Sequence, residues 1–227
     1  MAKLSIVSTP IGNLGDITFR AIETLKNANL VLCEDTRVTR KLLEKYEIKT
    51  RTISYHSHSK LSRVEEIIGL LKDGKNLALV SDAGTPGISD PGAELVGRVR
   101  EELTGEIGSG ELKIESVPGP SALTAALAIA GVPCADFLFL GFLPHKKGRQ
   151  TLFKEIAESK RTVVFYESPH RLMKTLGSLQ SARVTVCREL TKIFEEVVSG
   201  TAEEVLNHFQ SNPDKVKGEF VIIVSGK

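Results

Sequence analysis

A group of charged residues directly follows a short apolar run near the start of the chain. Residues 34–37 (EDTR) come after the run LVLC. Functional side chains are often presented where a buried strand ends, and a carboxylate placed there can accept a proton. The alternative is structural, because Asp35 or Thr36 could cap the helix that follows. Capping requires a single acceptor, however, and it leaves Glu34 and Arg37 unexplained.

A loop rich in glycine and proline follows a second apolar run. Residues 81–92 (SDAGTPGISDPG) contain three glycines and two prolines and come after residues 77–80 (LALV). Glycine permits backbone angles with positive φ and lets a ligand approach the main chain, whereas proline fixes the bends. An ordinary strand-to-helix turn would need only two or three such residues. We therefore interpret this segment as a ligand-binding loop at the C-terminal end of a parallel strand.

Other apolar runs end in the same kind of segment. At least six predicted strands end in charged or glycine-proline loops, among them residues 9–15, 34–37, 81–92, 118–122, 167–171 and 188–192. Six such endings together predict a composite small-molecule pocket at the strand ends, between two domains. His56 and His58 have a spacing that could bind a metal, but no third or fourth ligand lies nearby in the sequence, and we expect no metal site.

Short apolar runs and amphipathic segments alternate through the first half of the chain. One such helix is expected to reach residue 27, with Asp16 as its N-cap. This alternation is typical of an α/β domain with a mostly parallel sheet. Residues 104–110 are expected to form an exposed turn. We place the domain boundary at Pro118, which gives domains of residues 1–118 and 119–227.

The composition excludes several classes of protein. The 227 residues carry a formal net charge of +2, so no global basic field marks a nucleic-acid-binding protein, and such binding would need a local patch. We find no apolar run long enough to cross a membrane and no signal peptide. Cys33, Cys134 and Cys187 are far apart in apolar sequence, so we expect reduced core thiols in a cytoplasmic protein.

Taken in order, the strand-end segments resemble a known family. TPIGNLGD, EDTR, DAGTPG, VPGPSA, GFLP, ESPHR and RELTK occur one after another over nearly the whole chain. In this order they resemble the ribosomal RNA small subunit methyltransferase I family of the tetrapyrrole methylase superfamily. The resemblance implies a two-domain α/β fold, with a mostly parallel N-terminal sheet, a mixed C-terminal sheet and a cofactor cleft between them. It also implies a homodimer that uses S-adenosylmethionine to methylate the ribose 2′-oxygen of a decoding-centre cytidine in 16S rRNA.

The same resemblance places the cofactor against loops from both domains. We expect these contacts to be made mainly by backbone groups, which glycine and proline hold in fixed positions. The residues carried over for cofactor binding are Pro10, Ala83, Gly84, Thr85, Ile88, Ser121, Ala122, Glu167 and Leu190.

The implied reaction decides which side chains matter. The methyl group is already activated, so the enzyme must mainly align the acceptor hydroxyl, and a base helps because that hydroxyl is a poor nucleophile. Our hypothesis is that Glu34 or Asp35 accepts or orients the proton and that Arg37 holds the adjacent phosphate. Further candidates for the base, also at a strand end, are Glu167 and His170.

Several cations are expected to contact RNA. Arg37, Arg171, Arg188 and Lys192 are predicted phosphate contacts. For Arg188 an ion-pair network joining the two domains is an equally good interpretation. The basic turn at residues 145–149 is another candidate grip on rRNA, although a short charge run is more often a solvated surface.

Three other functions would share some of these features. A relative that methylates a tetrapyrrole or a diphthamide precursor would have the same fold and cofactor, but the EDTR and ESPHR segments argue against it. A non-catalytic module would bind S-adenosylmethionine and transfer nothing. A dinucleotide-dependent oxidoreductase is disfavoured because the full glycine fingerprint is absent.

Overall fold

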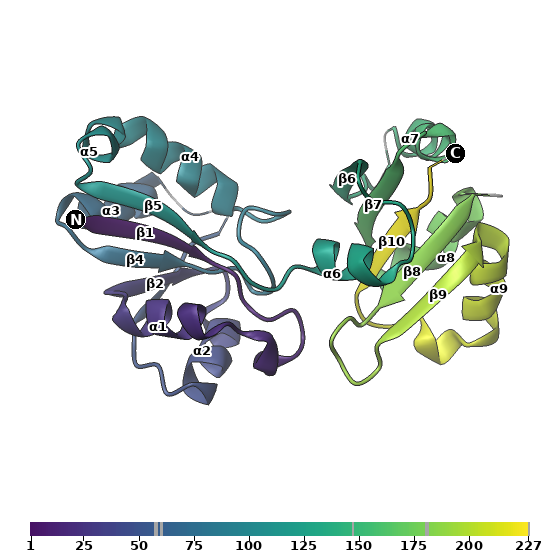
Figure 1. Ribbon diagram of the computed structural model, residues 1–227, viewed down its shortest axis with the longest axis horizontal. Helices are drawn as coiled ribbons and strands as arrows, with labels where there is room; N and C mark the ends of the chain where they lie inside the picture. Colours follow the sequence, from purple (N-terminus) through teal and green to yellow (C-terminus); the bar gives the residue numbers. More distant parts are fainter. Residues whose placement is uncertain (57–58, 60, 147, 180–181, 227) are drawn as a thin grey trace. The chain divides into compact units, whose positions relative to one another are not determined.

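The computed structural model describes residues 1–56, 59, 61–146, 148–179 and 182–226 (Figure 1). His58 therefore lies outside the described residues. The chain separates into two compact units, Met1–Ser121 and Ala122–Lys227. Within the described residues, no helix combines the length and the apolar character needed to cross a bilayer.

The first unit is built on a five-stranded sheet in which all strands are parallel. The strands are β1 (Ala2–Val7), β2 (Leu30–Cys33), β3 (Thr52–Ser54), β4 (Asn76–Leu79) and β5 (Leu112–Val117), in the order β3-β2-β4-β1-β5. Every residue of β2 is buried. Helices cover both faces of the sheet, which explains why its inner strands β2 and β4 are nearly continuous apolar runs. The predicted parallel sheet is confirmed.

Two groups of helices cover the two faces of this sheet (Figure 1). Helices α1 (Phe19–Asn27) and α2 (Thr36–Lys45) pack on one face, where Leu25 and Leu43 join Val31 in one core cluster. Helices α3 (Leu61–Lys72), α4 (Gly92–Glu102) and α5 (Thr104–Gly108) pack on the other, where Ile67 and Leu95 join Leu32. Because Val31 and Leu32 are neighbours in β2, they point to opposite faces.

Three local predictions are wrong. Asp16 does not cap α1, because it ends a short 3-10 helix (Leu14–Asp16) and the Thr18 hydroxyl accepts the N–H of Ala21 instead. The segment expected to be an exposed turn contains α5, since Ile107 packs against the core. Cys134 is exposed, whereas Cys33 and Cys187 are the buried thiols that were expected.

The second unit contains a mixed sheet, as expected, and this sheet has five strands. These are β6 (Phe137–Phe142), β7 (Thr162–Glu167), β10 (Phe220–Val224), β8 (Arg183–Arg188) and β9 (Glu196–Thr201), in that spatial order. β6 runs parallel to β7, and the other neighbouring pairs are antiparallel.

One face of this sheet packs against three helices. Helices α7 (Arg149–Glu158), α8 (Pro169–Ser178) and α9 (Ala202–Ser211) supply Phe153, Leu172 and Phe209 to the core of the unit. A capping box begins α9, with Thr201 and Glu204 each accepting the other's backbone N–H. Helix α6 (Ala122–Ile129) lies on the opposite face, where the carbonyl of Ala126 is 4.0 Å from the thiol of Cys187. A short 3-10 helix (Pro213–Lys215) precedes β10.

Candidate active site

The C-terminal ends of β2 and β4 form a branch point in the first sheet. These strands are neighbours, yet the chain leaves β2 through α2 on one face and leaves β4 toward α4 on the other. Loops that diverge in this way open a crevice at the strand ends, which is where open α/β sheets bind ligands. The two segments singled out in the sequence, residues 34–37 and 81–92, therefore lie at the same edge of the sheet.

The glycine-proline loop is tied to the loop after β1. The backbones of Thr9 and Gly84 form an antiparallel bridge, with N–H to carbonyl distances of 2.9 and 3.0 Å in the two directions. The hydroxyl of Thr9 also donates to the carbonyl of Ser81 at 3.1 Å. Gly84 has a φ of 83°, a conformation that suits glycine. Pro10, next to Thr9, is thereby brought close to Gly84, so two residues predicted to bind the cofactor lie together.

Thr85 joins this assembly to the loop after β5. Its hydroxyl lies 2.9 Å from that of Ser8 and donates to the carbonyl of Pro120 at 3.1 Å. Since Ser121 follows Pro120 directly, the predicted cofactor residues Thr85 and Ser121 also belong to one cluster of strand ends. Ala122, the next residue, begins α6 in the second unit.

Asp90 fixes the remainder of the central loop. Its Oδ1 atom accepts the N–H groups of Gly87 and Gly92 at 2.6 and 2.7 Å. A methyl group on Gly92 would come within 2.9 Å of the nitrogen of Gly87, so only glycine fits there. The loop thus holds a fixed shape while the side chains of Ala83 and Ile88, both predicted cofactor contacts, stay exposed. The sequence interpretation missed Asp90, although an acidic residue two positions before a helical glycine is a capping signal.

Asp35 is held by its neighbours on α2. Its carboxylate accepts the backbone N–H of Arg37 at 2.8 Å and also binds the guanidinium, with Oδ2 2.6 Å from Nη2. These hydrogen bonds to Arg37 lower the pKa of Asp35 to about 2. Asp35 is therefore the N-cap of α2, as the structural alternative proposed, and its low pKa makes it a weak base.

Glu34 occupies a different environment although it is the adjacent residue. It lines a recess of about 10 Å³, together with Tyr55, Ser81, Pro86 and Asp90. Partial burial, and then the negative charges of Asp82 and Asp90, raise the pKa of the Glu34 carboxyl, whereas His56 lowers it by a smaller amount. Asp82 also accepts the backbone N–H of Asp35 at 3.0 Å, which fixes the β2 loop against the β4 loop. Glu34 is therefore the better proton acceptor of the two.

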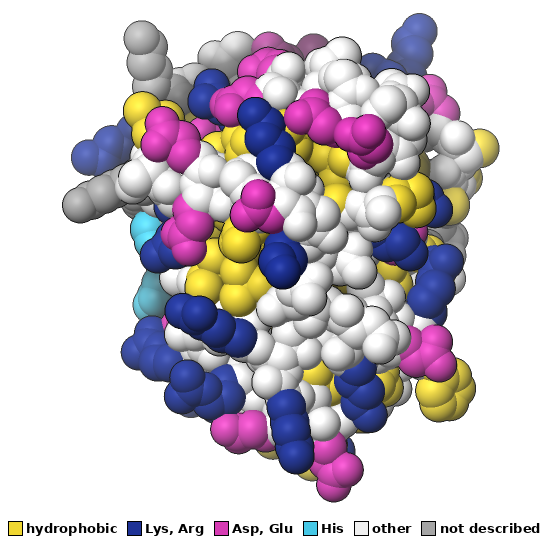
Figure 2. Space-filling view, turned by 90° about the vertical axis from the view of Figure 1, so that its left-hand side faces the viewer, with side chains coloured by type: hydrophobic (Ala, Val, Ile, Leu, Met, Phe, Trp, Pro, Cys, Tyr) yellow, Lys and Arg dark blue, Asp and Glu magenta, His cyan; other side chains and the backbone are white. Residues whose placement is uncertain are grey.

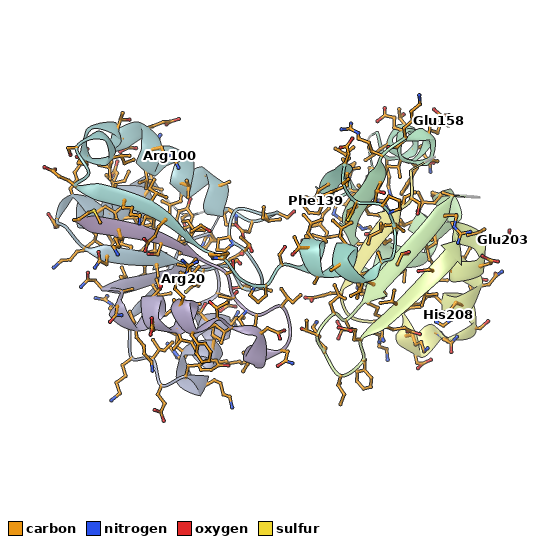
Figure 3. The ribbon with its side chains drawn as sticks, in the orientation of Figure 1. Arg20, Arg100, Phe139, Glu158, Glu203 and His208 are labelled. Atoms are coloured by element: carbon orange, nitrogen blue, oxygen red, sulfur yellow. The ribbon has the colours of Figure 1, made fainter. Side chains whose placement is uncertain are left out.

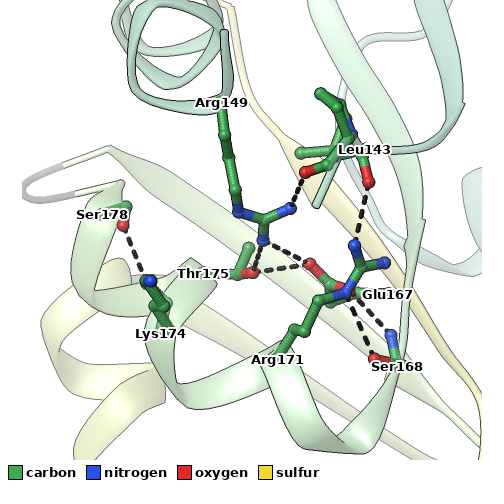
Figure 4. Close-up of polar contacts among 9 residues, drawn as sticks. Leu143, Arg149, Glu167, Ser168, Arg171, Lys174, Thr175 and Ser178 are labelled. Carbon is green, nitrogen blue, oxygen red and sulfur yellow. Dashed lines mark hydrogen bonds and ion pairs between the residues drawn. The ribbon is translucent and has the colours of Figure 1, made fainter. Parts of the chain in front are cut away.

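In the second unit, the carboxylate of Glu167 is the centre of a buried network (Figure 4). Its Oε2 atom is 2.9 Å from Nη2 of Arg149 and 2.6 Å from the hydroxyl of Thr175. Its Oε1 atom is 2.7 Å from Nε of Arg171 and accepts the N–H of Ser168 at 2.9 Å. Both oxygens are thus occupied, so any contact of Glu167 with a cofactor falls to its backbone.

The two arginines of this network also hold the turn that follows β6. Arg171 donates to the carbonyl of Leu143, and Arg149 donates to the carbonyl of Pro144, both at 2.9 Å. The network therefore fixes the ends of β6 and β7 together. Arg149 belongs to the turn considered for rRNA binding, but its side chain is only 6% exposed. The charge pattern alone did not reveal this buried role.

The last residue of β8 and the loop that follows it supply three more of the predicted residues. Arg188 donates to the carbonyls of Lys217 and Phe194, at 3.1 and 3.0 Å. Lys192 binds the carboxylates of Glu189 and Glu219, at 2.8 and 2.9 Å. Leu190, which lies between Arg188 and Lys192 in the sequence, is buried. The contacts described for Arg188 and Lys192 lie within the second unit and stabilise this loop.

The four side chains predicted to contact RNA differ in how much of each is exposed to solvent. The side chain of Arg37 is 85% exposed, whereas those of Arg171, Arg188 and Lys192 are 16, 9 and 25% exposed and engaged as described above. His170 is exposed in the first turn of α8. Arg37 is thus the one of the four whose guanidinium faces solvent most fully.

Comparison with known proteins agrees with this architecture. Residues 3–206 match the family model of tetrapyrrole (corrin/porphyrin) methylases. Among solved structures, the methyltransferase CobJ has a TM-score of 0.68 at 18% identity, with 99% of this chain and 93% of that chain covered. Diphthine synthase has a TM-score of 0.69 at 14% identity, with 99% and 90% covered. These structures show the class of fold: the tetrapyrrole methylase fold.

Similarity in sequence is more specific. Ribosomal RNA small subunit methyltransferase I of Thermotoga maritima is 46% identical over 231 residues, covering both chains completely. The proteins of that name from Synechocystis and Bacillus subtilis are each 45% identical, over all of this chain and 80% and 76% of theirs. The chain belongs to the ribosomal RNA small subunit methyltransferase I family. It is a methyltransferase, and its cofactor is S-adenosylmethionine.

The loops of the first unit fit this cofactor. Ala83 and Ile88 offer exposed apolar surface, and the bridge between Thr9 and Gly84 holds the surrounding backbone in place. S-adenosylmethionine combines a flat adenosine with a short zwitterionic tail, and small residues with fixed backbone groups suit both parts.

Proposed function

We propose that this enzyme methylates the ribose 2′-oxygen of a cytidine in the decoding centre of 16S rRNA. The main support for this proposal is that the chain is 41 to 46% identical, over nearly its whole length, to proteins named ribosomal RNA small subunit methyltransferase I. The partly buried position of Glu34 near Asp82 and Asp90 supports a reaction in which the methyl-accepting hydroxyl loses a proton to a base. We include a cytoplasmic homodimer in the proposal, and sedimentation of the purified chain tests the dimer.

The site residues divide the work as follows. S-adenosylmethionine supplies a methyl group on a positively charged sulfur, which leaves as a neutral thioether. The ribose oxygen forms the new bond to the methyl carbon, and Glu34 takes the proton that this oxygen loses. Asp35 holds α2 and Arg37 in place, and Arg37 contacts the phosphate beside the acceptor ribose.

The cofactor lies against Pro10, Ala83, Gly84, Thr85 and Ile88 in this proposal. Ser121, Ala122, Glu167 and Leu190 complete its pocket, mainly through backbone groups. Asp90 and Glu167 act as positioning residues, because each holds a loop that contacts the cofactor.

Single substitutions of the two adjacent carboxylates test these roles. Glu34→Gln removes the base, and we expect a loss of about 10² to 10⁴ in kcat on small ribosomal subunits. Asp35→Asn keeps an oxygen for the cap, so we expect a much smaller loss. Equal rates for the wild type and Glu34→Gln would remove Glu34 from the mechanism, and a larger loss in Asp35→Asn would reverse the assignment.

A further inference from the structure

The two helical faces of the first unit carry opposite charge. Residues 20–51, which include α1 and α2, contain eight lysines and arginines against five aspartates and glutamates. Residues 61–111, which include α3, α4, α5 and the loop between β4 and α4, contain five against ten, and two of these ten, Asp82 and Asp90, belong to that loop. A net charge of +2 for the whole chain conceals this division. An ordinary solvated surface mixes the two signs, so the separation calls for an explanation.

The cations of the first group are accessible to solvent, and six of the eight lie on α1 or α2. All eight are exposed: Arg20, Lys26, Arg37, Arg40, Lys41, Lys45, Lys49 and Arg51. Figure 2 shows lysine and arginine side chains gathered over the lower part of the unit, where α1 and α2 lie, with more acidic side chains above. We call these eight residues the basic face. Within the described residues, the ion pair found on it joins Arg37 to Asp35.

The basic face begins at the candidate active site. Arg37, Lys41 and Lys45 are spaced four residues apart, so they form a stripe along one side of α2. At 1.5 Å of rise per residue, this stripe extends about 12 Å from the N-terminus of the helix. That N-terminus is Asp35, the neighbour of Glu34. A polyanion that follows the stripe is led to the proposed base.

We propose that the basic face binds the phosphate backbone of the rRNA substrate and guides its acceptor nucleotide to Glu34. The inference rests on the proposed function for its choice of RNA. A phosphate backbone is bound by a row of exposed cations and needs no deep pocket. The basic face fits this requirement, because six of its eight exposed cations lie on α1 and α2. The opposite face, rich in carboxylates, repels RNA and so restricts the side from which the substrate approaches.

The alternative to RNA as the binding partner of the basic face is a second copy of the chain. The acidic face of one molecule is complementary to the basic face of another, but pairing two different faces joins molecules head to tail and gives open chains or rings. The RNA interpretation is favoured because the stripe starts at the active site. Self-association that depends on Lys41 and Lys45 would therefore count against the proposal.

Two double variants with the same change in charge test it. Lys41→Glu with Lys45→Glu reverses two cations of the basic face, and Lys72→Glu with Arg100→Glu reverses two exposed cations of α3 and α4. Figure 3 labels Arg100 and Arg20, which lie on opposite sides of the sheet. Binding to 16S rRNA and to small subunits, binding of S-adenosylmethionine and sedimentation are measured for each.

We expect the basic-face variant to bind RNA about tenfold to a hundredfold more weakly, and the control variant to bind as the wild type does. The plot of log affinity against log salt should become shallower by about 0.7 to 0.9 for each phosphate that the variant no longer neutralises. Cofactor affinity should be unchanged in both. If Lys41→Glu with Lys45→Glu does not fold, Lys41→Gln with Lys45→Gln replaces it.

Three results would overturn the proposal: equal weakening by both variants, no weakening by either, or loss of self-association with unchanged RNA binding. RNA binding is measured separately from methyl transfer. The proposal that the basic face binds RNA and the proposed methylation of a cytidine can therefore fail independently. A wild-type protein that binds RNA through the basic face but methylates no cytidine would contradict only the proposed function.

Discussion

Nη2 of Arg149 lies 2.9 Å from Oε2 of Glu167, although the two residues are 18 positions apart, and both side chains are almost completely buried. Thr175 bridges them, since its hydroxyl donates to Glu167 at 2.6 Å and accepts from Arg149 at 2.7 Å. A buried charge without its partner is costly, which makes this pair sensitive to the loss of either member.

Removal of Arg149 should therefore destabilise the second unit. We expect Arg149→Met to lower the free energy of unfolding by about 3 to 5 kcal/mol, because it leaves the Glu167 carboxylate with fewer partners. Thr175→Val should cost about 1 to 3 kcal/mol, and Thr175→Ser, which keeps the hydroxyl, should cost less. Urea unfolding measures all three. A change below about 0.5 kcal/mol for Arg149→Met would mean that the network is dispensable.

The activity should depend on pH through Glu34. The base must be ionised, and burial together with Asp82 and Asp90 raises its pKa. As the pH is lowered, kcat should therefore begin to fall at a higher pH than it would with an ordinary glutamate as the base. The folded state also binds this proton more tightly than the unfolded state does. The stability contributed by Glu34 is therefore greatest below its unfolded pKa and is lost as pH rises through its folded pKa.

Glu34→Gln should consequently be at least as stable as the wild type at neutral pH while being far less active. Thermal unfolding and kcat measured between about pH 5 and 8 check both parts. A variant that loses stability at neutral pH, or a wild-type rate that does not change with pH, would contradict this environment for Glu34.

The central loop should depend on Asp90. Asp90→Ala removes the acceptor of two backbone N–H groups, and Gly92→Ala forces a methyl group against the nitrogen of Gly87. We expect each substitution to weaken S-adenosylmethionine binding by about tenfold or more, as measured by calorimetry. Ala93→Ser, at an exposed position of the same helix, serves as the control. Unchanged affinity in Asp90→Ala would show that the loop keeps its shape without this carboxylate.

The three thiols should differ in reactivity. Burial raises the pKa of Cys187 to about 11 and also raises that of Cys33, so little of either is present as reactive thiolate. Cys134 is exposed. A thiol reagent should therefore modify one cysteine in the native protein and three after denaturation, and Cys134→Ser should abolish the native reaction. Native modification of Cys187 would contradict its burial.

Much of the fold could be predicted from local patterns. Apolar runs such as LVLC and LALV are sufficient to indicate buried parallel strands, and Gly84 and Gly87 indicate a loop with positive φ. β9 was missed because it is a half-exposed edge strand of mixed composition, which leaves no buried apolar run to detect.

The site residues were harder to predict because their roles depend on distant partners. The sequence placed Glu34 and Asp35 together but could not separate them. The difference arises from Arg37, which lowers the pKa of Asp35, and from partial burial followed by the charges of Asp82 and Asp90, which raise the pKa of Glu34. Asp82 and Asp90 are far from Glu34 in the sequence. Arg149 likewise looked like a surface charge until its contact with Glu167 was known. Spacing reveals which residues lie at strand ends, but not which of them are already paired.

The most direct test of the proposed reaction is methyl transfer from labelled S-adenosylmethionine to small ribosomal subunits from cells lacking this gene, followed by nucleoside analysis. We expect the label in 2′-O-methylcytidine, together with a strong loss in Glu34→Gln. A label in a methylated base, or no transfer by a protein that still binds the cofactor, would contradict the proposed reaction.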